Sequence, residues 1–263
     1  MIQLASEIKA LIKHKDLLNQ MIGREIKARY KQSVLGYGWA ILVPLLNLVV
    51  LSIVFSYLFK VPTGNVPYPI FLFVALVPWT FFSNSLVSAT SSIMDNSALI
   101  TKVKLPREII PLAAIGSKLI DLLLTFLILI LLLFVYRVEF HETFIIVPFI
   151  FILQLTFMAG VAFFLTATNV FFRDIGNALG IFLTIWMYLT PVIYSPQMIP
   201  DNLRFLFYLN PMTAIINAYR DTILFGSLPD FTQITYAIFI SFTLLFLGYF
   251  YFKKRARLFA DVI

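Results

Sequence analysis

Long blocks without a charged residue constrain this chain more than any other feature. No Asp, Glu, Lys or Arg occurs in residues 32–59, 61–94, 143–172 or 175–200. A helix needs about 20 apolar residues to cross the hydrocarbon core of a bilayer, so each block is long enough to span it. With 60% hydrophobic residues, the chain has more apolar surface than a soluble domain of its length can bury. The sequence therefore predicts an integral membrane protein.

The apolar blocks indicate helices rather than barrel strands. Residues 122–135 are apolar on every side, with Thr125 as the one polar residue, whereas barrel strands alternate between apolar and polar residues. We expect an all-α polytopic protein with six transmembrane helices. The expected spans are residues 34–59, 68–93, 109–136, 144–172, 175–194 and 231–252.

Lys and Arg gather on one side of this topology. An even number of spans puts both termini on the same side, and that side carries the N-terminal segment, residues 102–107, Arg173 and the basic tail. Cytoplasmic loops of membrane proteins are rich in Lys and Arg. We therefore expect both termini in the cytoplasm and the protein in the inner membrane. The same bias accounts for the net charge of +7 without a nucleic-acid partner.

Two segments on the basic side read as amphipathic helices. Residues 1–33 place apolar residues at three- and four-residue spacing between basic ones, which is typical of a helix on a membrane surface or against a partner. Residues 95–105 form a shorter amphipathic pattern with Leu99, Ile100 and Val103. Such an exposed apolar surface needs a partner, although a positively charged loop without a partner is an alternative. Residues 34–263 form the predicted transmembrane domain.

On the opposite side, residues 196–229 are apolar but broken by prolines. Their longest charge-free run is too short to span a bilayer, so we expect a pair of short helices on the outer face. Asn210 before Pro211 predicts the turn between them, because the residue before proline is biased out of the helical region.

Lys118 and Asp121 are ionisable residues inside the third predicted span. They lie three residues apart and share one helix face, which favours a structural ion pair. A functional role is the alternative, because a charged side chain within a membrane costs free energy and is rarely present without a function. A proton relay would need further acids, which the other spans do not supply.

Aromatic residues cluster near the span ends and have two interpretations. They anchor helices at the membrane interface, or they line a pathway and stack on sugar rings. The lining candidates are Trp39, Tyr57, Trp186, Tyr188 and Tyr194. Glycines predict close helix packing for two spans. They are Gly36 and Gly38 at the start of span one, and Gly176 and Gly180 in span five.

The sequence lacks the motifs of an enzyme. No G-x-x-x-x-G-K-[ST] phosphate loop occurs, so we expect no ATP hydrolysis by this chain alone. The chain has no Cys, which excludes a Cys-built metal or redox centre. Glu139, His141 and Glu142 read as a solvated turn rather than a metal site.

Several ordered fragments resemble one family. They are Arg29-Tyr30-Lys31-Gln32-Ser33 with Leu35-Gly36 and Trp39, Leu105-Pro106-Arg107-Glu108 with Pro111, Phe172-Arg173-Asp174-Ile175, Thr190-Pro191-Val192-Ile193-Tyr194, and Asn210-Pro211 with Arg220. In this order they resemble the permease subunits of ABC type-2 polysaccharide exporters, those for O-antigen most of all, and the resemblance covers essentially the whole chain.

The resemblance implies a homodimer that binds two copies of a separate nucleotide-binding subunit, which holds ATP and Mg. It also implies a coupling helix at residues 95–105, gate helices at about 196–229, and lipid-linked polysaccharide as substrate. The residues expected at the ATPase interface are Asn96, Leu99, Ile100, Lys102, Val103, Lys104, Arg107, Arg24 and Arg29. The expected gate residues are Asn210, Pro211 and Arg220.

Other functions stay open at this point. Permeases for teichoic acid, capsule, a drug or a small lipid share the expected topology. An ion-coupled secondary transporter would need buried carboxylates and inverted repeats, of which only Asp121 is found. A membrane-bound enzyme has the least support, because no catalytic constellation is visible.

Overall fold

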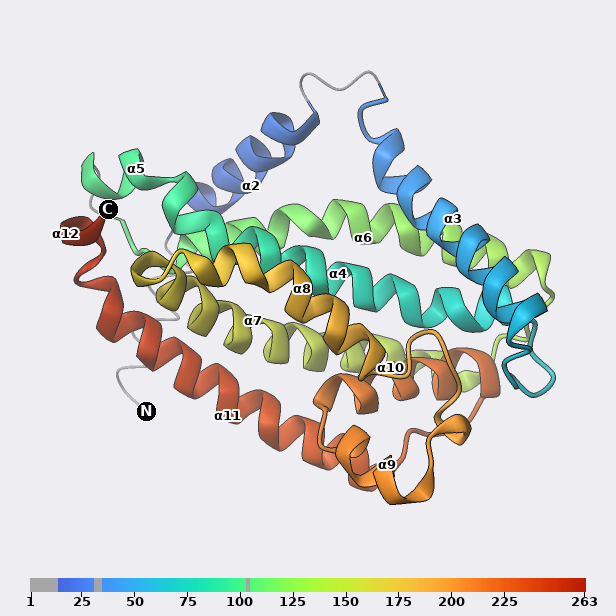
Figure 1. Cartoon of the computed structure of the whole chain (residues 1–263). Coiled ribbons are helices and arrows are strands. Elements are labelled where there is room, and N and C mark those ends of the chain that lie inside the picture. Colours follow the sequence, from blue (N-terminus) through green and yellow to red (C-terminus); the bar gives the residue numbers. More distant parts are fainter. Residues whose placement is uncertain (1–13, 31–34, 103–104) are drawn as a thin grey trace.

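A computed structural model describes residues 14–30, 35–102 and 105–263. Within these ranges the chain forms helices and connecting turns, and the long helices run side by side along a common axis (Figure 1). The long elements are α3 (Gly38–Ile53) with its π-helical extension η1 (Val54–Leu58), α4 (Tyr68–Asp95), α6 (Ile109–Val135), η2 (Glu142–Ile146) with α7 (Val147–Phe171), α8 (Asp174–Tyr188) and α11 (Phe231–Ala256).

Five of these helical segments in the described part of the chain are long and apolar enough to cross a membrane. They are Gly38–Leu58, Tyr68–Asp95, Ile109–Val135, Glu142–Phe171 and Phe231–Ala256. The chain is therefore a multi-pass membrane protein.

The predicted fifth span ends earlier than the sequence indicated. It corresponds to α8, which has 15 residues and so a length of about 22 Å. The helix stops because Pro191 disfavours a helical conformation at the preceding Thr190 and cannot supply a backbone N–H. The chain continues beyond Tyr188 through a non-helical turn instead of a further helical turn.

At one end of the bundle lie the short helices α9 (Asp201–Tyr208) and α10 (Pro211–Arg220), followed by the π-helical turn η4 (Asp221–Phe225). A 3-10 turn, η3 (Pro196–Met198), precedes them. α10 is almost wholly buried and packs on α4, α7 and α11. It is therefore part of the core rather than a surface hairpin.

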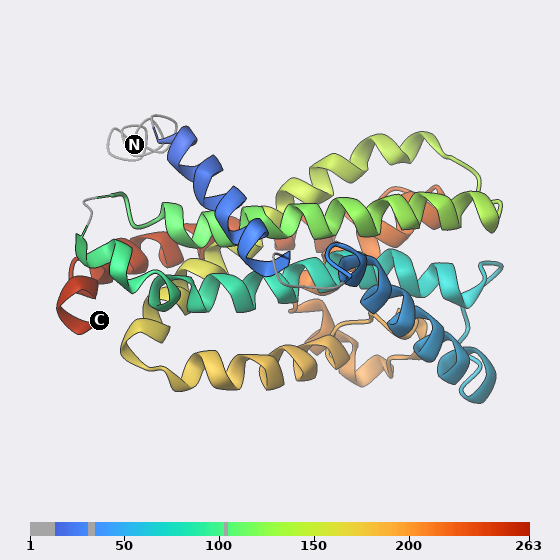
Figure 2. The same ribbon diagram turned by 90° about the horizontal axis from the view of Figure 1, so that it is seen from above.

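The other end, here called the basic end, is built from α2 (Lys15–Tyr30), α5 (Ser97–Lys102), α12 (Phe259–Val262) and the ends of the long helices (Figures 1 and 2). A separate hydrophobic cluster holds these parts together, with Met21, Ile100, Ile109 and Phe259 among its buried members. The sequence-based predictions for residues 1–13 and 31–33, and those for Val103 and Lys104, lie outside the described residues.

Close backbone contact occurs between α7 and α11. A Cβ on Gly160 would lie 2.5 Å from the backbone N of Leu245, so only glycine fits there. The sequence instead nominated spans one and five. Of the nominated glycines, Gly36 and Gly180 have no atom within 4 Å of a Cβ position, whereas a Cβ on Gly176 would lie 2.9 Å from Oδ1 of Asn169 in α7, so close contact is found at Gly176.

Candidate functional site

One face of α4 is open and polar, although α4 is the most buried long helix. Beyond its first turn, the side chains that are not buried are Thr80, Ser83, Asn84, Val87, Ser88, Ser91, Met94 and Asp95. They recur every three or four residues and therefore share one face of the helix. Lipid has no hydrogen bonds to offer such groups, so the polar stripe is suited to water or to a polar ligand.

α3 and α8 border this polar stripe. Both pack on α4, and Figure 2 shows them along the same edge of the bundle. Their outward sides are not covered by the rest of the described chain. In the most apolar stretch of Gly38–Leu58, only 6% of the residues are buried. In α8 the described buried side chains are Leu179 and Leu183. The stripe thus lies between the apolar sides of α3 and α8, here called its walls.

Three of the five predicted lining aromatics lie on these walls with accessible rings. Trp39 is 47% exposed at the start of α3, Tyr57 is 75% exposed in η1, and Tyr188 is 55% exposed at the end of α8. Exposure puts these rings where a membrane interface or a ligand can contact them.

The other two lining candidates are engaged in packing. Trp186 lies edge-on against Phe82, with ring centroids 5.3 Å apart, and its indole N–H donates to Oδ1 of Asn210 over 3.0 Å. The Tyr194 hydroxyl donates to the carbonyl of Tyr188 over 2.7 Å. Both side chains therefore hold the turn after α8 in place.

Asn210 joins α8 to α10. Its side chain caps α10 by accepting from the Met212 N–H over 3.1 Å, and its Nδ2 donates to Thr190 Oγ1 over 2.8 Å. Pro211 at the first position of α10 is compatible with a helix start. One amide thus fixes both the end of α8 and the beginning of α10.

Arg220 at the end of α10 is only 2% exposed. Its guanidinium donates to the carbonyls of Pro191 over 2.5 Å and Val192 over 2.6 Å, and it lies 3.7 Å above the ring of Phe71 in α4. A buried charge requires such partners. Arg220 therefore ties together α10, the turn after α8 and the start of α4.

A cavity of about 390 Å³ adjoins Arg220 and includes Asp221, Asp230 and Asn217 in its wall. Burial raises the pKa of the Asp221 carboxyl to about 6; Arg220 opposes this rise and Asp230 adds to it. The charge of Asp221 thus changes within a mildly acidic range.

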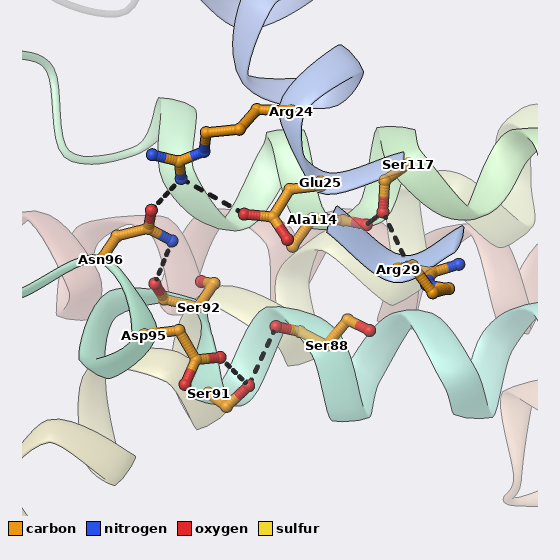
Figure 3. A network of polar contacts seen from close by, with 10 residues as sticks. All are labelled: Arg24, Glu25, Arg29, Ser88, Ser91, Ser92, Asp95, Asn96, Ala114 and Ser117. Atoms are coloured by element: carbon orange, nitrogen blue, oxygen red, sulfur yellow. Dashed lines mark hydrogen bonds and ion pairs between the residues drawn. The ribbon is translucent and has the colours of Figure 1, made fainter. Parts of the chain in front are cut away.

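Lys118 and Asp121 do not form the predicted pair. Asp121 Oδ2 instead accepts from Nη1 of Arg29, in α2, over 2.6 Å. Figure 3 shows the neighbouring contact, in which Arg29 Nη2 donates to Ser117 Oγ over 3.3 Å. Arg29 comes from 92 residues away in the sequence, so helix spacing alone could not reveal this pairing.

The predicted interface residues of α5 whose side chains are described, Leu99 and Ile100, pack towards the chain itself. Ile100 is only 5% exposed, and Leu99 packs against the same cluster at the basic end. The prediction that these apolar residues need an external partner was therefore wrong for Ile100, because the chain covers it itself. Ala98 and Thr101 are the exposed members of α5. Lys102 lies in α5, but its side chain is outside the described set.

Arg24 of α2 reaches the turn that starts α5. Its guanidinium donates to Oδ1 of Asn96, and Asn96 Nδ2 donates to the Ser92 carbonyl over 2.8 Å (Figure 3). Arg24 also pairs with Glu25 at 3.3 Å. Two of the predicted interface residues, Arg24 and Asn96, are thus brought together as one structural unit.

Two further contacts brace the basic end. The buried Glu108 accepts from Lys253 of α11, and Arg107 lies over the Phe259 ring, 5.9 Å from its centroid. The end of α11 and α12 are therefore fixed to the segment that follows α5. Sequence reasoning missed the pairing of Glu108 with Lys253, since nothing in a single sequence links residues so far apart.

Sequence reasoning also missed the polar stripe of α4. A signal existed, because Thr80, Asn84, Ser88 and Ser91 recur at helical spacing within an otherwise apolar span. Within the described residues, no group of three or more His, Cys, Asp or Glu is placed to hold a metal ion.

Comparison with known proteins places this arrangement among transporter subunits. Residues 16–224 match the ABC-2 type transporter family. The chain is similar to the O-antigen export system permease protein RfbA of Myxococcus xanthus, with 32% identity over 97% of this chain and 98% of the relative. A protein of the same name from Klebsiella pneumoniae is 30% identical over 94% of this chain and 95% of its own length. The polysialic acid transport protein KpsM of Escherichia coli is 23% identical over 88% of this chain and 90% of its own length.

Proposed function

The chain belongs to the ABC-2 type transporter family, and from that premise we propose that it forms the membrane channel of an exporter for lipid-linked O-antigen polysaccharide. Export of polysaccharide is supported by the names of its relatives, which cover nearly the whole chain. The relatives act on different polymers, so export of a capsular polymer is the second candidate.

The polar stripe of α4 carries this proposal. A polysaccharide has many hydroxyls, each of which would cost several kcal/mol, roughly, if left without a partner in lipid. Thr80, Asn84, Ser88 and Ser91 offer hydroxyl and amide partners along one line. The aromatic rings of Trp39, on the α3 wall, and Tyr188, on the α8 wall, suit the C–H faces of sugars.

A closed channel requires a second copy of the chain. The stripe is accessible in the single chain, and α3 and α8 expose Val50, Ile53, Ile181 and Phe182. A homodimer in which the two stripes face each other encloses them and covers part of these walls. Lipid covers the apolar surfaces that remain.

An ATPase is the proposed energy source. The chain lacks a phosphate loop, so we place two copies of a separate subunit, holding ATP and Mg, at the basic end. α2 and α5 provide the contact, with Ala98 and Thr101 on the accessible side of α5. Arg24 and Asn96 link α5 to α2, so a push on α5 is passed to α2 and the start of α3.

The orientation follows from charge. The basic end carries Arg107, Arg173, Lys253 and Lys254, so we place it in the cytoplasm under the positive-inside bias. α8 with the turn after it forms the fifth of six proposed crossings. With six crossings both chain termini lie in the cytoplasm, and α9 and α10 form the gate at the outer face of the inner membrane.

Filling the stripe with apolar side chains tests the proposed function. Ser88→Leu together with Ser91→Leu should strongly reduce surface polysaccharide while the protein level in the membrane stays normal. Thr243→Leu on α11 is the matched control, because it also replaces a partly exposed hydroxyl with leucine but lies on a different helix from the stripe. Normal export by the double variant would contradict the channel assignment. Export of small amphiphiles but not polymer by the wild type would refute polysaccharide as the substrate.

A further inference from the structure

An apolar cavity of about 360 Å³ opens between α6 and α7, over the first half of α4. These three helices supply most of its wall, and Tyr219 of α10 and Ile223 of η4 complete it. Figure 2 shows α6 and the beginning of α7 along the edge of the bundle opposite to α8. The cavity is therefore separate from the polar stripe, which lies between α3 and α8.

The wall of this cavity offers little to a polar ligand. Gln154 and Tyr219 carry its polar side chains, and both are already engaged. Gln154 Nε2 donates to the Pro78 carbonyl over 2.8 Å, and the Tyr219 hydroxyl donates to Gln154 Oε1 over 3.0 Å. A buried water needs about two to four polar partners, which this wall does not supply. The cavity therefore suits an apolar ligand, held by dispersion contacts.

The cavity opens towards the hydrocarbon of the membrane. Leu123 in its wall is 61% exposed, and the exposed Leu127 and Leu131 continue the same face of α6. Phe149 and Ile152 are exposed on α7. Both helices belong to segments that are long and apolar enough to cross a membrane. Lipid tails are as apolar as leucine, so acyl chains are the molecules that meet these two rows of side chains.

The depth of the cavity is consistent between helices. On α4 the wall begins at Val74, six residues after Tyr68, and on α6 it ends at Leu129, six residues before Val135. Each position therefore lies about 9 Å from the end of its helix that is nearer to α10. Half of the hydrocarbon core is about 15 Å thick. The cavity thus lies within the hydrocarbon and extends from the α10 side towards the middle of the bilayer.

We propose that this cavity binds one acyl chain of a bilayer phospholipid, from the leaflet on the side of α10. The acyl chain enters between α6 and α7 and contacts Val77 and Tyr219. An empty cavity of this size would deprive its wall of dispersion contacts, which the acyl chain restores. Because Tyr219 and Ile223 belong to α10 and η4, the bound chain also supports the position of the proposed gate. The inference requires the membrane location of the protein, but neither an ATPase nor a polysaccharide.

A phosphatidylcholine with a photoreactive diazirine in one acyl chain tests the site in the full-length protein, reconstituted into nanodiscs. Val77 and Tyr219 are 3% and 6% exposed, so an acyl chain reaches them only from inside the cavity. A lipid that merely coats the protein labels exposed residues such as Phe239 and Phe242 of α11. We expect mass spectrometry of the peptides to find label on Val77 or Tyr219 as well as on exposed residues.

Filling the cavity should remove this internal label. Leu122→Trp fills it from α6 and should abolish the label on Val77 and Tyr219, and Val147→Trp, from α7, provides a second test if the first variant does not fold. Leu127→Trp is the matched control, because it adds the same ring to α6 at an exposed position outside the cavity wall. Phosphatidylcholine added to delipidated protein in detergent should raise the melting temperature of the control more than that of Leu122→Trp, since a ligand of the folded state stabilises it.

Label confined to exposed side chains would overturn the proposal, because the lipid would then only coat the surface. Equal label on Val77 and Tyr219 in Leu122→Trp and Leu127→Trp would overturn it as well. A disulfide between two copies through Leu123→Cys, without internal label, would assign this face to a second copy; the chain has no Cys of its own. Lost polymer export with normal internal label would count against the channel function and leave this site intact.

Discussion

Gly248 of α11 lies directly against the backbone carbonyl of Gly160 in α7. This contact brings the two helix backbones together, and α7 and α11 share the most extensive helix–helix contact in the described bundle. A Cβ on either glycine would overlap backbone atoms of the other helix, and backbone cannot move aside as a side chain can.

We therefore expect Gly160→Ala or Gly248→Ala to destabilise the fold by about 1–3 kcal/mol, which is typical of an overpacked helix contact. Thermal unfolding of the purified protein in detergent measures this. Gly180→Ala should leave stability unchanged or slightly higher, because open space surrounds that position in the chain. Similar melting temperatures for all three variants would refute the close contact.

Arg220 should be essential for the outer end of the fold. Arg220→Ala would leave the carbonyls of Pro191 and Val192 buried without a donor, at a cost of more than about 3 kcal/mol. Arg204→Ala serves as a control, because it breaks only the exposed pair with Asp201, which contributes about 1 kcal/mol or less. Limited proteolysis near residues 189–200 should cut the first variant and spare the second.

Stability should depend on pH through Asp221. Burial raises its pKa from 3.8 to about 6, so the folded state binds the proton more tightly than the unfolded state. The contribution of this group is therefore favourable at low pH and is lost as the pH rises through about 6. Asp221→Asn should raise the melting temperature at pH 7.5, and the gain should shrink as the pH falls towards 4. A gain independent of pH would argue against this account.

The two faces of α5 should behave differently. Cysteine at Ala98, which is exposed, should cross-link to the proposed ATPase subunit when the two are co-expressed, whereas cysteine at the buried Ile100 should not. Ile100→Ala should lower stability by about 2 kcal/mol or more through a cavity in the cluster at the basic end. Cross-linking from position 100 with normal stability would show that α5 is turned the other way.

Much of the architecture could be predicted because the relevant signals are local in sequence. Charge-free blocks identify helices that need lipid. Asn210 before Pro211 likewise marks a helix start from two adjacent residues. The early end of α8 was missed, although Pro191 provided a local reason for it.

The contacts of single side chains could not be predicted, because they join positions far apart in the chain. Asp121 pairs with Arg29 rather than with its neighbour Lys118, and Ile100 turns inward rather than towards a partner.

The sequence by itself determined that this chain is a helical membrane protein of one transporter class, since hydrophobicity, charge bias and motif order are properties of the linear chain. Only the tertiary structure decided which face of each helix stays open. Burial depends on which helices pack together, and that packing leaves the α4 stripe accessible while it buries Arg220.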